Sequence, residues 1–166
     1  MVTWTSVEEE LLSLAGSVPD PELPVLTLED LGVVRGVEVH DSDHVTVRLT
    51  PTYTGCPAIE AMSADIERVL HDHGVAEVSV ETVLSPAWST DDISAEGRRK
   101  LAEFGIAPPR PHDTASGGPV PLALSVRCPH CGSTETELLS RFSSTACKAL
   151  RRCVACQEPF DHFKEL

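Results

Sequence analysis

Apolar residues at the start of the chain recur every three or four positions, the spacing of one face of a helix. They stand at Trp4, Val7, Leu11, Leu14 and Val18. Thr5 or Ser6 can cap this helix, because Glu8 or Glu9 follows three residues later and completes a capping box. Pro19 then breaks the pattern, so the sequence predicts a first helix that ends before it.

A period of two follows an irregular stretch that leads into residues 28–32. Apolar and polar side chains alternate on both sides of a polar turn at residues 41–43. The apolar positions are Val37, Val39, Val45, Val47 and Leu49. Alternation on both sides of a short turn predicts a β-hairpin with one buried face.

The next segment returns to helical spacing and then alternates once more. A second helix is predicted between residues 57 and 74, with a buried face of Ile59, Met62, Ile66 and Val69. A third strand is predicted from the alternating positions Val78, Val80, Thr82 and Leu84. Ser94 can cap a third helix that carries Leu101 and Phe104 and ends at Gly105.

The predicted order, α-β-β-α-β-α, describes a small α+β domain over residues 1–107. Residues 108–123 are rich in proline and glycine, a composition that favours a semi-extended linker. The remaining residues, 124–166, can hardly build a self-sufficient apolar core. The second domain therefore needs another source of stability.

Two Cys-x-x-Cys pairs supply that source. They are Cys128/Cys131 and Cys153/Cys156, separated by 21 residues. Two such loops form the tetrahedral four-sulfur site that structural zinc prefers, so residues 124–166 are predicted to form a four-cysteine zinc ribbon. Rubredoxin-like iron, an iron–sulfur cluster or disulfides are the alternatives. Gly132 suits the first loop, where a positive φ is needed, whereas Gln157 holds that place in the second and marks a point of expected distortion.

Charge is distributed unevenly along the chain. The net charge of the chain is −13. Residues 1–109 contain 20 acidic and 6 basic side chains, so this part alone carries −14. An acidic body repels phosphate backbones, so general nucleic-acid binding is not expected, and a nucleic-acid-binding ribbon is only a distant alternative.

The ribbon carries one basic cluster, formed by Lys148, Arg151 and Arg152 beside Cys153. Four thiolates on a zinc ion give the site a net charge of about −2, which these cations can offset. The other interpretation is a docking patch for an acidic partner.

The cysteines and the apolar runs also indicate a compartment. No basic start precedes a long apolar run, and no stretch approaches 18 apolar residues, so neither a secretory segment nor a membrane span is expected. Six cysteines, four of them in metal-type spacing, fit a reducing environment. We expect a soluble cytoplasmic protein, whose oligomeric state the sequence does not fix.

Cys56 is the residue most suggestive of chemistry. It follows a predicted strand and precedes Pro57, a residue favoured in the first turn of a helix. A thiol at a helix N-terminus faces free backbone N–H groups, which stabilise the thiolate as a nucleophile or metal ligand. The alternative is a buried small apolar side chain, the usual state of a lone cysteine.

Other candidate residues each carry a functional and a structural interpretation. Asp20 and Glu22 flank Pro21, where they either build a turn or approach Cys56 in space. Trp88 lines a cleft with Asp91 and Asp92, or packs as an ordinary buried aromatic. Two further residues lie in the ribbon. For Cys147 three interpretations are open: a thiol that packs around the metal ligands, a spare ligand, or an ordinary buried side chain. His130 is expected to be exposed and not to bind the metal.

Several segments together resemble a known family. They are Asp20-Pro21-Glu22, the hairpin, Thr54-Gly55-Cys56-Pro57, Ser85-Pro86-Ala87-Trp88, Arg98-Arg99-Lys100-Leu101, Cys128-Pro129-His130-Cys131 and Ser144-Thr145-Ala146-Cys147-Lys148-Ala149. The first three resemble the small domain of SufT-related iron–sulfur assembly factors. Combined with the others, they resemble the PaaD subunits encoded with the bacterial phenylacetyl-CoA epoxidase system.

The resemblance implies an accessory role in aerobic phenylacetate degradation rather than catalysis. Its implied partners are the reductase or oxygenase subunits of the epoxidase, and its implied task is iron–sulfur cluster assembly in the reductase. Cys56, Asp20 and Glu22 match the family's motif cysteine and acidic pair, which implies a transient Fe or iron–sulfur cluster as cargo beside the structural zinc. A structural adaptor without cluster chemistry and a thiol-dependent enzyme are the competing hypotheses.

Overall fold

The computed structural model describes residues 5–41, 43–111 and 125–166, and it divides into two compact units, Met1–Gly97 and Arg98–Leu166. The predicted boundary lies later, after residue 107. The difference arises because Ile106 and Ala107 pair with the last strand of the ribbon. Most of the predicted linker, residues 112–123, lies outside the described residues. Within the described ranges, no helix has the length and apolar character needed to cross a bilayer.

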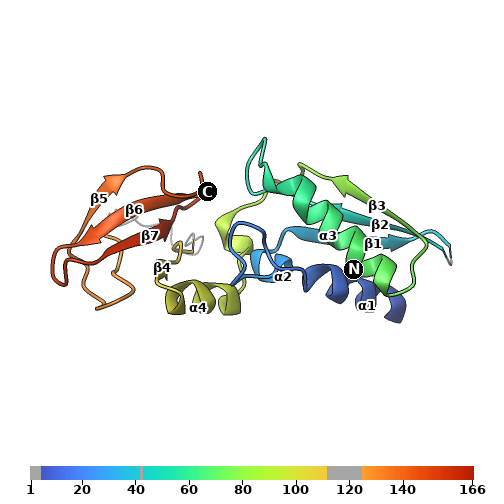
Figure 1. The fold of residues 1–166 in the computed structure, drawn as a ribbon, viewed down its shortest axis with the longest axis horizontal. Helices are drawn as coiled ribbons and strands as arrows, with labels where there is room; N and C mark the ends of the chain where they lie inside the picture. The colour runs from blue at the N-terminus through green and yellow to red at the C-terminus, as the bar shows by residue number, and fades with distance from the viewer. Residues whose placement is uncertain (1–4, 42, 112–124) are drawn as a thin grey trace, which may run out of the picture. The chain divides into compact units, whose positions relative to one another are not determined.

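The first unit confirms the predicted alternation of helices and strands and adds two short elements. Its elements are α1 (Ser6–Gly16), α2 (Leu28–Leu31), β1 (Val34–Val39), β2 (His44–Leu49), α3 (Ala58–Asp72), β3 (Glu77–Thr82) and the 3-10 turn η1 (Thr90–Asp92). The strands form a sheet in the order β1-β2-β3, antiparallel between β1 and β2 and parallel between β2 and β3. Figure 1 shows α1 and α3 lying along one face of this sheet.

Helix α1 begins at the predicted capping box. The Glu8 N–H donates to Thr5 Oγ1 over 3.3 Å, and the Thr5 N–H donates to Glu8 Oε2 over 2.8 Å. Leu11 and Val18 are buried as predicted. Val7 is 53% exposed, contrary to prediction, because burial of this helix begins only at Leu11.

Helix α3 contacts β3 and α1 through residues spaced four apart. Its buried residues are Ala58, Met62, Ile66 and Leu70. The predicted Ile59 and Val69 lie at the margin of this face and are only partly buried. The helix therefore packs through a face rotated slightly from the predicted one.

Strands β1 and β2 place most of their apolar residues in the core under these helices, whereas Val78 and Val80 of β3 are only partly buried. Val37, Val45, Val47 and Leu49 are all at most 3% exposed, as the alternation predicts. Leu84, expected to be the last apolar position of the third strand, is 62% exposed because β3 already ends at Thr82.

The loop after β3 returns to α2 and is fixed there by polar contacts. The indole N–H of Trp88 donates to the Leu31 carbonyl over 2.7 Å, and the side chain is 7% exposed. Arg35 Nη2 lies 3.0 Å from Asp92 Oδ2. Trp88 is therefore a packed aromatic that holds the loop, and Asp92 belongs to an ion pair.

The second unit contains a four-stranded sheet. Its elements are the larger part of α4 (Ala95–Glu103), β4 (Ile106–Ala107), β5 (Thr136–Ser140), β6 (Lys148–Cys153) and β7 (Pro159–Phe163). The strand order is β4-β7-β6-β5, and β4 runs parallel to β7. Ser94 caps α4 as predicted, accepting from the Gly97 N–H over 2.9 Å. Leu101 is buried, but Phe104 is 67% exposed because it lies just beyond the last turn of the helix.

Candidate metal centre and the Cys56 turn

The four ribbon cysteines gather at one point. The sulfur atoms of Cys128, Cys131, Cys153 and Cys156 all lie within 4.8 Å of one another. Cys128 Sγ is 3.8 Å from Cys156 Sγ, and Cys131 Sγ is 3.5 Å from Cys153 Sγ. A tetrahedron with metal–sulfur bonds of about 2.3 Å has edges of about 3.8 Å. The donor set and its spacing therefore fit zinc, and they fit a single iron ion equally well.

The two loops that carry these cysteines repeat the same backbone hydrogen bonds. In the first loop, the Cys128 N–H donates to Ser133 O over 2.8 Å and the Gly132 N–H to Cys128 O over 2.9 Å. In the second, the Cys153 N–H donates to Glu158 O and the Gln157 N–H to Cys153 O, both over 3.0 Å. This repeated knuckle turns each pair of thiols toward the other pair.

Gln157 adopts the backbone conformation expected of glycine at its position. Its φ is +64°, beside +78° for Gly132, and it is the only non-glycine residue with positive φ within the described ranges. The side chain partly compensates by donating from Nε2 to Val154 O over 2.6 Å. The backbone at Gln157 is thus strained, as the sequence suggested, but the hydrogen-bond pattern of the knuckle is intact.

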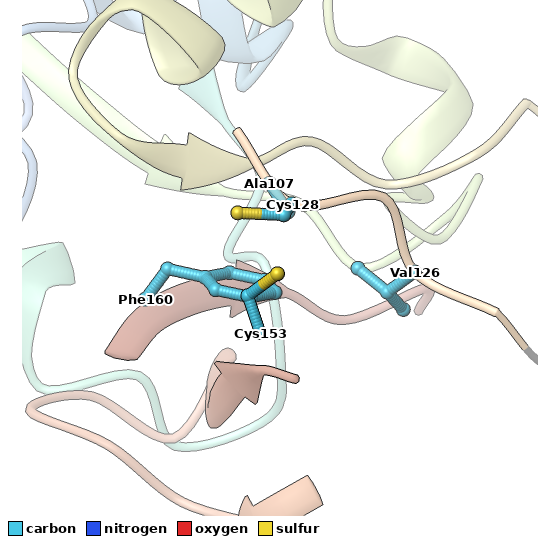
Figure 2. Close-up of a cluster of buried hydrophobic side chains, with 5 residues drawn as sticks. All are labelled: Ala107, Val126, Cys128, Cys153 and Phe160. Atoms are coloured by element: carbon cyan, nitrogen blue, oxygen red, sulfur yellow. The ribbon is translucent and has the colours of Figure 1, made fainter. Parts of the chain in front are cut away.

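A small apolar cluster supports the sulfur site from behind. Cys128 and Cys153 are at most 1% exposed and pack with Ala107, Val126 and Phe160. Figure 2 shows the Phe160 ring beside Cys153, with Cys128 and Ala107 across from them. Ala107 comes from β4, which the sequence assigned to the first domain. The one sequence signal for its place in this cluster is the short apolar pair Ile106-Ala107 that follows the helix end at Gly105.

The thiols differ in how readily they ionise. The Cys156 N–H, which reaches Cys153 Sγ over 3.5 Å, is the main cause that lowers the pKa of Cys153 to about 7. The Glu158 N–H lowers the pKa of Cys156, but burial and the other three cysteines outweigh it and raise this pKa to about 12. Four thiols this close cannot all ionise without a cation, so metal binding has to release protons.

Cys147 and His130 do not belong to the metal set. Cys147 is 6% exposed, and its Sγ lies 3.0 Å from Thr145 Oγ1. It is therefore a buried side chain and not a spare ligand. His130 is exposed, as expected, and lies near Gly105.

The predicted basic docking cluster does not form one surface. Lys148 is only 4% exposed, and its Nζ lies 3.5 Å from Asp161 Oδ2. Arg152 pairs with Glu137 on the neighbouring strand. Side chains alternate between the faces of a strand, so Arg151 points away from the face that carries Lys148 and Arg152. The docking prediction is wrong for Lys148, because this side chain is buried within the ribbon.

Cys56 occupies the turn that joins β2 to α3. Its N–H donates to Tyr53 O over 3.2 Å, and its carbonyl accepts from the Ile59 N–H over 3.4 Å. The helix begins two residues later, and its N-cap residue, Pro57, provides no side-chain cap. Cys56 is thus at a helix start, as predicted, with first-turn N–H groups that no capping side chain occupies.

The surroundings of the Cys56 thiol limit what it can do. The residue is 6% exposed, and no hydrogen bond to its Sγ is present among the described residues. A thiol-dependent enzyme needs a base within hydrogen-bond reach of the sulfur. Within the ranges that the structure describes, this hypothesis has no base to rely on.

Asp20 builds a turn. Its Oδ1 accepts from the N–H groups of Glu22 and Leu23 over 2.9 and 2.7 Å, and the residue is 7% exposed. The four ribbon cysteines are the only potential ligand group of three or more residues in the described part of the chain. The structure therefore does not assemble Asp20, Glu22 and Cys56 into a metal-binding trio.

Two family models match the chain in succession. One is described as "Iron-sulfur cluster assembly protein" and matches residues 8–84, which include Cys56. The other is described as "PaaD zinc beta ribbon domain" and matches residues 113–164, which include all four clustered cysteines. Together they agree with the two domains that the resemblance implies, and the ribbon match begins at residue 113, inside the predicted linker.

Full-length similarity joins the two matches. A protein of Escherichia coli (strain K12), provisionally named as one of the subunits of 1,2-phenylacetyl-CoA epoxidase, is 46% identical over 155 residues, covering 93% of this chain and 91% of that protein. An Fe-S protein maturation auxiliary factor of Porphyromonas gingivalis (strain ATCC BAA-308 / W83) is 34% identical over 99 residues, covering 59% of this chain and 93% of that protein.

A solved structure agrees with the match to the first domain. The DUF59 domain of Bacillus anthracis has a TM-score of 0.53 and 29% identity, covering 57% of this chain and 90% of its own. That coverage is close to the extent of the first compact unit. The chain belongs to the PaaD family, in which an iron–sulfur-assembly domain is joined to a zinc beta ribbon.

Proposed function

We propose that this protein is a cytoplasmic accessory of a phenylacetyl-CoA epoxidase system and assists iron–sulfur cluster assembly in the reductase component. The family membership supports the accessory role. The assembly task is supported by relatives named as Fe-S protein maturation factors, which cover the first domain. On this proposal the protein has protein clients and no substrate chemistry of its own.

The observation that carries the proposal is the position of Cys56 at the uncapped start of α3. The helix spans Ala58–Asp72, and its N-cap residue Pro57 leaves the first turn without a side-chain cap. Gly55 has φ +81°, and a Cβ there would meet no atom within 4 Å, so the described residues leave space at this turn. Since Cys56 is 6% exposed, this turn has to open before a client can reach the sulfur.

A single thiolate suits cargo that has to be released. A metal ion or cluster held by one protein sulfur keeps its other coordination positions for donor and client ligands. Transfer is then an exchange of ligands in which the Cys56 sulfur leaves as client sulfurs arrive, with no change in oxidation state. On this proposal Asp20 is not a ligand of the cargo; its carboxylate holds the turn at Glu22 and Leu23.

The ribbon site has the opposite character on this proposal. Four cysteines fill the coordination sphere of a tetrahedral zinc ion and leave no open position, so zinc there supplies structure alone. The knuckle hydrogen bonds orient the four sulfurs, and the cluster of Ala107, Val126 and Phe160 keeps water from one side of the site.

The test compares two serine variants of buried cysteines. Cys56→Ser should lower the iron–sulfur occupancy of the co-expressed reductase, measured by visible absorption and iron and sulfide analysis after anaerobic purification. Cys147→Ser is the matched control, because Cys147 is equally buried but lies in the ribbon outside the metal set. If occupancy and growth on phenylacetate remain at the wild-type level in Cys56→Ser, Cys56 has no part in the function.

The burial of Cys56 favours a second candidate function, a structural adaptor that holds epoxidase subunits together. A thiol that is 6% exposed is the usual state of a packing residue. The adaptor predicts stoichiometric co-purification with an oxygenase or reductase subunit and no effect of Cys56→Ser. It also predicts loss of co-purification on charge reversal at Arg151 and Arg152, which Cys56-dependent maturation does not require.

A further inference from the structure

The second unit contains a pocket that neither the metal site nor the proposed maturation role uses. Its volume is ≈ 520 Å³, within the range of about 300–1,000 Å³ typical of small-molecule sites. Its apolar wall includes Ala102, Ala107, Val126 and Pro129. Ala107 and Val126 also belong to the apolar cluster that contains Cys128 and Cys153 (Figure 2), so the pocket and the metal site share part of one wall.

Three arginines converge on this apolar space. Arg98, Arg110 and Arg127 all line the pocket, although the whole chain holds only 13 basic residues beside 26 acidic ones. Each comes from a different segment, namely α4, the stretch after β4, and the approach to the first knuckle. Arg127 donates to Gly132 O over 2.9 Å and forms no ion pair with any described residue. Most of the donors of its guanidinium therefore remain for another acceptor.

The carboxylate of Glu165 contacts residues that line the pocket. The Arg110 N–H donates to Glu165 Oε1 over 3.2 Å, and Arg110 Nε lies 3.7 Å from the same atom. The other carboxylate oxygen lies 3.8 Å from Nε2 of His162, a buried residue that also lines the pocket. A carboxylate of the chain itself thus already lies beside two residues that line the pocket, Arg110 and His162.

The charge balance decides between one carboxylate and a more highly charged anion. Cys128 lines the pocket, and its four-thiolate site carries about −2 when zinc is bound. The zinc–thiolate site and Glu165 together match the charge of the three arginines, so a dianion such as phosphate would leave a larger excess of negative charge than a monocarboxylate. We propose that this pocket binds an apolar monocarboxylate, with the carboxylate on Arg127 and the hydrocarbon part against Ala107 and Val126.

The proposal is independent of the maturation role and is tested on the full-length, zinc-loaded chain. Octanoate and its neutral counterpart octanamide are titrated while the methyl signals of Ala107 and Val126 are followed by NMR. We expect saturable shifts of these methyl groups, and about tenfold tighter binding of octanoate than of octanamide, because a charge-assisted hydrogen bond is lost in the amide. Equal affinities, or an absence of saturable shifts, would overturn the proposal.

Three substitutions test whether the charged residues at this pocket control the binding of the carboxylate. Arg127→Gln should weaken octanoate binding about tenfold and leave octanamide unchanged, whereas Arg141→Gln, an exposed arginine outside the pocket, should change neither. Glu165→Gln should tighten octanoate binding, because it removes a negative charge beside Arg110 and His162, two residues that line the pocket. A folding defect cannot produce that gain. If Glu165→Gln leaves the affinity unchanged or weakens it, the carboxylate site is refuted.

Discussion

Gly132 and Gln157 hold the same place in the two knuckles, each accommodating a positive φ and each donating its N–H to the first cysteine of its pair. A side chain in this conformation costs about 1–2 kcal/mol relative to glycine. The ribbon tolerates that strain at one knuckle, where the Gln157 amide reaches Val154 O.

Substitution at the two positions should therefore be asymmetric. Gly132→Ala should lower the free energy of unfolding of the zinc-loaded ribbon by about 1–2 kcal/mol, through backbone strain alone, because an added Cβ meets only Arg127 Nη1 at 3.9 Å. Gln157→Gly should stay within about 0.5 kcal/mol of wild type, since strain relief is offset by a lost hydrogen bond and a more flexible unfolded chain. Urea denaturation followed in the ribbon measures both. Equal losses of stability for the two substitutions would contradict the conclusion that both positions require a positive φ.

Metal removal should unfold the ribbon and leave the first unit folded. The apolar cluster of the second unit includes two metal ligands, so the cluster loses its support when the metal leaves. We expect one zinc per chain by elemental analysis, and loss of the NMR signals of β5, β6 and β7 after chelation while those of α3 persist. Stoichiometric iron in place of zinc would contradict the assignment of the site.

His162 should make the ribbon less stable as the pH falls. Burial lowers the pKa of His162; Arg151, Arg110 and Lys164 act in the same direction, and Glu165 opposes them. The unfolded chain then binds a proton that the folded chain does not, so stability is retained above the unfolded pKa of about 6.5 and is lost as the pH drops below it toward the folded pKa.

The His162→Gln variant separates this effect from protonation of the cysteines. The difference in unfolding free energy between wild type and variant should change between pH 7 and pH 5, with wild type losing more, and the slope is limited to about 1.4 kcal/mol per pH unit for one proton. Parallel stability curves for the two proteins would show that His162 does not titrate on unfolding.

Two basic residues of β6 should differ sharply in their contribution to stability. Lys148→Ala should destabilise by about 2–4 kcal/mol, because it removes a buried stem and leaves Asp161 without its cation. Arg152→Ala should cost less than about 1 kcal/mol, since its pair with Glu137 is exposed on both sides. Thermal unfolding of the two variants is the comparison. A similar loss for both would mean that Lys148 is not buried in solution.

Local patterns predict most of the first domain because each element there follows its own period. The capping box of Thr5 and Glu8, the hairpin and the start of α3 are decided by neighbouring residues and are confirmed. The errors concern burial at the ends of elements. Val7 and Phe104 continue a helical pattern, but no other element of the described residues covers the helix at these positions.

The metal site is predictable because the spacing of cysteines is itself the signal. What surrounds the site is not, since β4 is only two residues long and its partner β7 lies more than 50 positions away. The three cations of β6 form a group in the sequence because they are close along the chain. A strand separates such neighbours onto opposite faces, and burial of Lys148 depends on Asp161, which no local pattern links to it.

The parallel pairing of β2 and β3 determines which loop shares an edge of the sheet with the Cys56 turn. Parallel strands send their following loops to a shared rim, and the register that aligns Leu49 with Thr82 brings the Cys56 turn and the start of the loop after β3 to that rim. Leu84, 62% exposed, lies in this second loop. An apolar side chain from a stretch of chain almost thirty positions downstream is therefore placed at the same edge of the sheet as the Cys56 turn.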